Sequence, residues 1–245
     1  MKQLLKQSWN RFIALIQKNP SHCIIYGLML TLSSSLVFIS GNILQLTNIA
    51  QKNPQFAMVF QVIVLCISTA LILILVISMV RFLARLHQKN SVRTIQQELS
   101  EAVPFMIPAF LIIIMYNIIV FGGFLLLLIP GFIFSIWYFF SFFGVALENK
   151  GIRESLSYSK KLVQGRAWSL FFILILFNIL LGLAGKLLTN ILNILLSVTP
   201  LATIPPLGIF ILTLVTISIT GTILTVLHVG FVTSLYTIFK EKTTQ

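Results

Sequence analysis

The fold of this chain is constrained most strongly by long apolar segments that carry no charged residue. Residues 23–46 and 56–80 are two such segments, and no charge occurs from 102 to 147. At ~1.5 Å rise per helical residue, the first segment reaches ~36 Å, enough for a ~30 Å hydrocarbon core. These segments therefore predict transmembrane helices.

Composition agrees with a bilayer as the solvent. Hydrophobic residues make up 58% of the 245 residues and charged residues 9%, whereas soluble domains carry about 25% charged residues. We predict an all-α protein, a polytopic transmembrane helical bundle of about six spans with interfacial amphipathic helices. The predicted spans are 23–46, 56–80, 104–128, 132–148, 167–186 and 207–235. They form one membrane domain, 23–239, between an N-terminal interfacial segment, 1–22, and a cytoplasmic tail, 240–245.

The uncharged stretch 102–147 is too long for one span, so it must fold back as a hairpin. Pro130-Gly131 is the predicted turn, and Gly122-Gly123 is the alternative. In the polar stretch before it, Asn90-Ser91 is a candidate cap for a short helix.

The N-terminal segment is amphipathic. Apolar residues recur at helical spacing and are flanked by lysines and Arg11; they are Leu5, Trp9, Phe12, Ile13 and Ile16. Such a helix is expected to lie in the membrane interface with its aromatic face at headgroup depth. The Asn-Pro pair at 19–20 then predicts the start of the first span, with proline at its first helical position.

Basic residues are distributed unevenly between the loops. Of the 17 lysines and arginines, 15 lie in the N-terminal arm, the 81–103 and 148–166 loops and the C-terminal tail; Lys52 and Lys186 are the exceptions. With six spans, the positive-inside rule places both termini in the cytoplasm. We expect a multi-pass protein of the cell membrane (inner or plasma) whose basic face meets anionic headgroups.

Acidic residues are scarce. The chain has no aspartate and only five glutamates. No apolar segment contains the paired carboxylates on which metal-assisted hydrolysis and glycoside hydrolysis depend. The histidines, His22, His87 and His228, lie far apart. We therefore predict no catalytic residues, no metal site, no cofactor and no nucleic-acid partner.

The 148–168 loop is the most distinctive polar segment. Its helical periodicity is that of an interfacial amphipathic helix, and a docking surface for a partner or a phosphate-bearing lipid head is the alternative. The candidate contacts to lipid or partner are Arg153, Ser155, Ser159, Lys160, Lys161, Arg166 and Trp168.

Four polar residues are candidates for intramembrane roles. Asn117 and Asn178, near the middles of their spans, are placed to hydrogen-bond across helices. Lys186 is either a residue snorkelling at the outer end of the fifth span or part of a substrate or ion site. His228 is either a packed side chain or a proton relay.

A pattern from 130 to 168 resembles a known family. Pro130-Gly131, an apolar-aromatic span, Glu148 and Gly151 precede Ser155-Leu156-x-x-Ser159-x-x-Leu162-x-x-Gly165-x-x-Trp168. This pattern resembles the bacterial membrane domain attached to some glycerophosphodiester phosphodiesterases and also found as stand-alone six-span proteins. The resemblance implies an inner-membrane helical bundle. It does not imply phosphodiesterase activity, which belongs to a soluble barrel domain with metal-binding carboxylates.

The leading functional hypothesis is a non-enzymatic organiser of lipids or partner proteins at the cytoplasmic leaflet. Its expected partners are membrane lipids with anionic headgroups, and a protein partner or a homo-oligomer is left open. The alternative is a transporter or permease for a lipid or another apolar solute. An intramembrane enzyme is disfavoured, because a nucleophile near His228 would lack an orienting acid.

Overall fold

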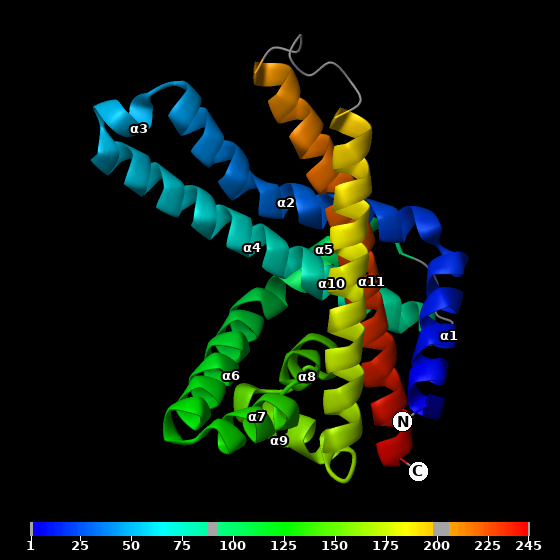
Figure 1. Ribbon diagram of the computed structural model, residues 1–245. Helices are drawn as coiled ribbons and strands as arrows, with labels where there is room; N and C mark the ends of the chain where they lie inside the picture. Colours follow the sequence, from blue (N-terminus) through cyan, green and yellow to red (C-terminus); the bar gives the residue numbers. More distant parts are fainter. Residues whose placement is uncertain (1, 88–92, 198–205, 245) are drawn as a thin grey trace. The chain divides into compact units, whose positions relative to one another are not determined.

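The computed structural model describes residues 2–87, 93–197 and 206–244. Every regular element within these ranges is helical, as Figure 1 shows. Among the described residues, six helical stretches are long and apolar enough to cross a membrane: Pro20–Gln45, Pro54–His87, Ile95–Leu126, Leu128–Glu148, Ala167–Ile191 and Ile211–Thr243. The prediction of an all-α, multi-pass membrane protein is confirmed.

The helices contribute to two compact units. Unit 1 comprises Met1–Pro20, Ile77–Leu180 and His228–Gln245, and unit 2 comprises Ser21–Val76 and Leu181–Leu227. Charge divides in the same way: all five glutamates and 15 of the 17 lysines and arginines belong to unit 1. Unit 2 carries only Lys52 and Lys186. The basic segments of the sequence therefore all belong to one structural unit.

Helix α1 (Lys2–Lys18) precedes α2 (Pro20–Leu46), so the predicted helix start at Pro20 is confirmed. The stripe of α1 that is buried within the protein consists of Leu4, Ser8, Phe12 and Leu15, while Trp9 and Ile13 are exposed. Phe12 is buried because it packs on Gly230 of α11 (Pro206–Thr244).

Unit 2 is held together by small and polar residues. A Cβ added to Gly221 would lie 2.7 Å from the Thr31 Cγ2 atom, so α2 and α11 are in close contact. The hydroxyls of Thr31 and Thr222 lie 3.2 Å apart, and Ser68 donates to the Ser33 carbonyl at 2.5 Å. Such contacts are typical of helices in lipid, where no hydrophobic effect drives their association. Unit 2 also includes the short α3 (Ile49–Lys52).

The second span is longer than predicted, because α4 extends from Pro54 to His87. The next helix, α5 (Ile95–Ala102), begins with a capping box in which the Thr94 hydroxyl accepts from the Gln97 N–H. Thr94 therefore caps this helix; the predicted cap, Asn90-Ser91, lies outside the described residues. A 3₁₀ turn, η1 (Val103–Phe105), leads into α6.

Both predicted hairpin turns are wrong. Helix α6 (Met106–Leu126) and α7 (Leu128–Trp137) are separated by Leu127 alone, in an extended conformation. Pro130 lies in the first turn of α7, where its missing N–H has no helical partner. A Cβ added to Gly123 would lie 3.0 Å from the Gly131 Cα atom. The glycines thus allow α6 and α7 to approach each other and do not form the turn.

The predicted fourth span consists of α7 and α8 (Ser141–Glu148), which are separated by a turn at residues 138–140. Helix α9 (Ile152–Val163) follows and packs on α8, and α6 to α9 lie together in Figure 1. A Cβ added to Gly144 would lie 3.0 Å from the Ser155 side chain. Because Gly144 has no Cβ, α9 can approach α8 closely at this point.

The last two helices extend past their predicted ends. Helix α10 (Ala167–Ser197) continues beyond 186, and the Thr189 hydroxyl donates to the Gly185 carbonyl at 2.9 Å, so this polar residue does not interrupt it. Helix α11 runs to Thr244, so residues 240–244 are helical and form no separate tail. Ion pairs of Lys240 and Glu241, described below, hold this last turn.

Candidate functional site

A polar cavity of about 370 Å³ lies within unit 1, between α4, α8 and α11. Its wall contains both cationic and anionic side chains. The lining residues are Arg81, Ala84, Arg85, His87, Leu147, Glu148, Tyr236, Thr237, Lys240 and Glu241. Three groups of ion pairs and hydrogen bonds surround it.

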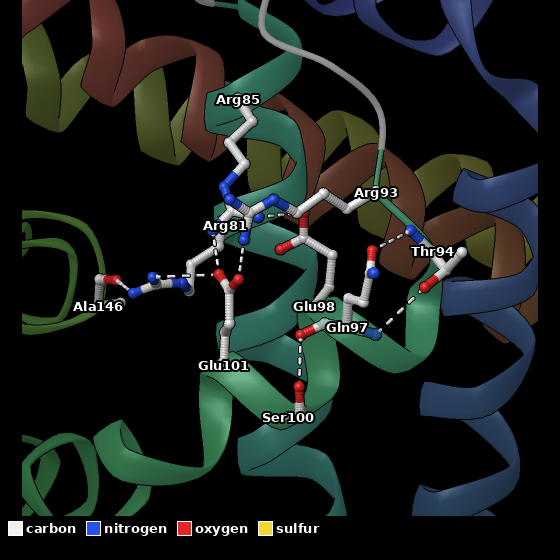
Figure 2. A network of polar contacts seen from close by, with 9 residues as sticks. All are labelled: Arg81, Arg85, Arg93, Thr94, Gln97, Glu98, Ser100, Glu101 and Ala146. Atoms are coloured by element: carbon white, nitrogen blue, oxygen red, sulfur yellow. Dashed lines mark hydrogen bonds and ion pairs between the residues drawn. The ribbon is translucent and has the colours of Figure 1, made fainter.

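The first group joins α4 to α5 (Figure 2). The Arg85 guanidinium contacts the Glu98 carboxylate at 2.7 Å and also pairs with Glu101. Arg93 forms a further ion pair with Glu101. The Glu98 side chain is only 1% exposed. Because a buried carboxylate is costly without a cation, Arg85 holds α5 against α4.

Arg81 connects the same group to the end of α8. Its guanidinium donates to the Ala146 carbonyl at 2.9 Å and lies 4.5 Å from the centroid of the Phe105 ring, as Figure 2 shows in part. Ala146 is in the last turn of α8, whose carbonyls lack helical partners and attract cations. The Glu101 carboxylate lies 3.9 Å away.

The second group is a relay of hydroxyls to Glu148. The Tyr236 hydroxyl donates to the Glu148 carboxylate at 2.7 Å, and the Lys240 ammonium contacts the same oxygen at 2.5 Å. Since Tyr236 uses its single proton there, the Tyr158 hydroxyl, 3.0 Å away, must donate to Tyr236. Burial raises the pKa of Tyr158, which keeps its proton available for this bond. The relay joins α8, α9 and α11.

The third group joins α1, α4 and α11. Arg11 pairs with Glu241 at 2.8 Å, and the His87 Nε2 atom lies 3.2 Å from the other carboxylate oxygen. The Lys18 ammonium donates to the Leu86 carbonyl at 3.4 Å. These contacts bring the two ends of the chain together within unit 1.

The three groups engage four of the five glutamates, Glu98, Glu101, Glu148 and Glu241, in ion pairs. A carboxylate held by cations is a poor general base, because its charged form is already stabilised. Within the described ranges, no three His, Cys, Asp or Glu side chains gather to hold a metal ion. The arrangement is suited to holding helix ends together and to binding a charged group by electrostatics.

The outer face of α9 is basic. Arg153, Lys160 and Lys161 are exposed, and the Lys160 ammonium lies 4.3 Å from the centroid of the Trp137 ring. Trp168 is 68% exposed. Arg166 is half-buried and donates to the Lys242 carbonyl at 3.2 Å. These five predicted contact residues therefore reach the surface of unit 1.

Ser155 and Ser159 do not reach the surface, because both are fully buried. Their prediction as lipid or partner contacts is therefore wrong. The Ser159 hydroxyl donates to the Trp137 carbonyl at 2.8 Å and accepts from the Phe140 N–H at 3.0 Å. It thus satisfies the backbone where the fourth span breaks. The small size of Ser155 lets α9 approach Gly144 of α8.

The predicted intramembrane polar residues have different local surroundings. Asn117 and Asn178 each donate to a carbonyl of their own helix, those of Ile113 and Leu174; no hydrogen bond joins them, contrary to the prediction. Lys186 is exposed and lies on α10 near the end of the apolar stretch Ala167–Ile191. The His228 ring stacks on Phe177, with ring centroids 6.2 Å apart, which agrees with a packed side chain.

Sequence reasoning missed the cavity and the residues that surround it. Arg81 and Arg85 counted only among the charges of a loop, Glu148 entered only through the family resemblance, and Tyr158 and Tyr236 were not singled out. One signal was available: every glutamate lies within or beside a basic segment. In a chain with so few acids, this distribution favours ion pairing over solvation.

Comparison with known proteins places this chain in a family. A family described as Domain of unknown function (DUF7847) matches residues 99–238, more than half of the sequence. The chain belongs to this family. The match includes all of α6 to α10 and most of α11, and with them Glu101, Glu148 and Tyr236 of the cavity region. No curated protein and no solved structure matches the chain.

Proposed function

We propose that this protein is a non-enzymatic organiser of anionic lipid headgroups at the cytoplasmic leaflet of the cell membrane. The supporting observation is the segregation of charge within unit 1. Four glutamates pair with cations inside the unit. Within unit 1, the exposed cations with no carboxylate partner among the described residues are Lys2, Lys6, Lys18, Arg153, Lys160 and Lys161. The exposed surface of unit 1 therefore carries an excess of cations, and each such residue contributes about 1 kcal/mol of attraction to an anionic membrane surface.

The cytoplasmic side is proposed from the positive-inside rule, which follows the basic loops. The resemblance of residues 130–168 to the phosphodiesterase-associated membrane domain stays a prediction. It adds the bacterial inner membrane as the proposed location. A protein partner that carries acidic groups is the competing occupant of the same surface.

The function is tested by reversing two charges. Lys160→Glu with Lys161→Glu should reduce retention of phosphatidylglycerol by at least tenfold, because each lost cation is worth about 1 kcal/mol. Native mass spectrometry of protein released from nanodiscs of equal phosphatidylglycerol and phosphatidylcholine measures the retained lipid.

The matched control reverses the two exposed lysines of unit 2, in the variant Lys52→Glu with Lys186→Glu. It should keep the phosphatidylglycerol preference of the unmodified protein. The proposed function is wrong if the unmodified protein retains both lipids equally, or if the two double variants lose phosphatidylglycerol to the same extent.

Transport of an amphipathic solute is the second candidate, favoured by the cavity beside the broken fourth span. Broken helices beside a polar cavity mark the binding sites of many transporters. If the protein moves lipid, vesicles containing it should expose inner-leaflet fluorescent phosphatidylglycerol to externally added dithionite. Ala84→Leu, which fills part of the cavity, should slow this exposure. Bleaching confined to the outer leaflet would exclude lipid transport.

A further inference from the structure

A second hollow in unit 1 differs in chemistry from the polar cavity. It is an apolar groove of about 310 Å³ between α7 and the first turn and a half of α10. Phe132, Ile133, Ile136 and Trp137 line one side, and Trp168 and Phe171 line the other. Its volume lies near the lower end of the ~300–1,000 Å³ typical of small-molecule sites.

Aromatic contacts set the shape of this groove. The Phe132 and Phe171 rings meet edge to face with centroids 6.1 Å apart, and Trp168 meets Phe171 in the same way at 5.9 Å. Phe132 and Trp168 nevertheless remain 47% and 68% exposed. The groove is therefore bounded by rings that are packed on one side and open on the other.

Cations lie at one end of the groove. The Lys160 ammonium lies over the Trp137 ring, and Arg166 directly precedes the α10 residues of the groove. No carboxylate pairs with Lys160, Lys161 or Arg166 in the part of the chain that the structure describes. Tryptophan beside lysine or arginine is typical of the depth where headgroups meet acyl chains.

We propose that this groove holds one acyl chain of an anionic glycerophospholipid whose phosphate lies against Lys160. The inference rests on the proposed function and gives the bound lipid a place. An apolar groove with a cationic end complements a molecule that has an acyl chain and an anionic head. The cation–π contact with Trp137 positions the ammonium at the boundary between the two, where a phosphate accepts a charge-assisted hydrogen bond.

The groove can be tested with brominated lipids, because bromine quenches tryptophan fluorescence only at short range. The chain has three tryptophans, and Trp9→Phe leaves only Trp137 and Trp168, both in the groove. This variant is reconstituted in phosphatidylcholine vesicles that contain a small fraction of brominated phosphatidylglycerol or brominated phosphatidylcholine. We expect half-maximal quenching at an about fivefold lower fraction of the phosphatidylglycerol, the effect of one cation at a membrane surface.

Three variants of Lys160 and its helix separate position from net charge. Lys160→Gln should abolish the difference between the two lipids, and Lys160→Arg should retain it. Arg153→Gln removes an equal charge from the same helix and should reduce the difference less than Lys160→Gln does, because Arg153 does not contact the groove residue Trp137. Circular dichroism checks that each variant keeps its helical content.

Two results would overturn the proposal that the groove binds an anionic lipid. Equal quenching by the two brominated lipids in the Trp9→Phe protein would do so, and so would an equal loss of preference in Lys160→Gln and Arg153→Gln. In either case, retention of phosphatidylglycerol in the nanodisc experiment would leave the proposed function standing with the lipid elsewhere on the surface of unit 1. If the nanodisc experiment also showed no preferential retention of phosphatidylglycerol, both the groove and the proposed function would be wrong.

Discussion

Gly230→Leu should release α1 from unit 1. A Cβ at this position would lie 2.3 Å from the Cε2 atom of the buried Phe12 ring, so a larger side chain cannot be accommodated without moving the helix. Overpacking of a buried contact costs about 1–3 kcal/mol, and the displaced α1 would also lose the Arg11–Glu241 ion pair. We expect a lower midpoint of thermal unfolding and faster hydrogen exchange in residues 2–18.

Gly182→Leu is the matched control, because no atom lies within 4 Å of a Cβ added there. It makes the same chemical change in α10 and should leave both measurements unaltered. If Gly230→Leu exchanged its N-terminal amides at the rate of the unmodified protein, the packing of α1 on α11 would be disproved.

Arg85→Ala should be among the most destabilising single substitutions in the charged region. It leaves the Glu98 carboxylate, whose side chain is 1% exposed, without its cation. Removing one partner of a buried ion pair costs about 3–5 kcal/mol, because the other charge remains buried. The measurement is the free energy of unfolding in detergent micelles.

A second substitution identifies the cause of the loss. In the Arg85→Ala background, Glu98→Gln removes the unpaired charge and should recover part of the stability. Arg153→Ala, at an exposed position on α9, should change it by less than about 0.5 kcal/mol. The explanation by a stranded charge fails if Glu98→Gln brings no recovery.

The helical spans were predictable because each depends on local composition. An uncharged segment of sufficient length has few alternatives to a membrane helix. Helices α2 and α4 each begin at a proline, which favours the first position of a helix. The boundaries were less predictable. Helix α10 continues past Thr189, because the hydroxyl of this residue donates a hydrogen bond to a carbonyl of the same helix. Helix α11 continues through its charged last turn, because Glu241 pairs with Arg11.

The α6–α7 hairpin shows why the pattern of glycines misled. Glycine and proline are common in turns, so Gly122-Gly123 and Pro130-Gly131 indicated a turn from local chemistry. Glycine is instead required at 123 and 131 because the backbones of α6 and α7 lie close together there. That distance is a property of packing, which a local pattern does not contain.

By itself, the sequence determined an all-α membrane protein with its charges concentrated in a few segments, because apolar runs and charge counts act locally. Only the tertiary structure decided the site. It turned Ser159 inward to a broken helix, gathered Tyr158, Tyr236 and Lys240 around Glu148, and paired Arg11 with Glu241. These partners lie up to 230 positions apart in the chain. A charged side chain does not determine by itself which residue it will pair with. The pairs therefore form only when the helices pack in the folded protein.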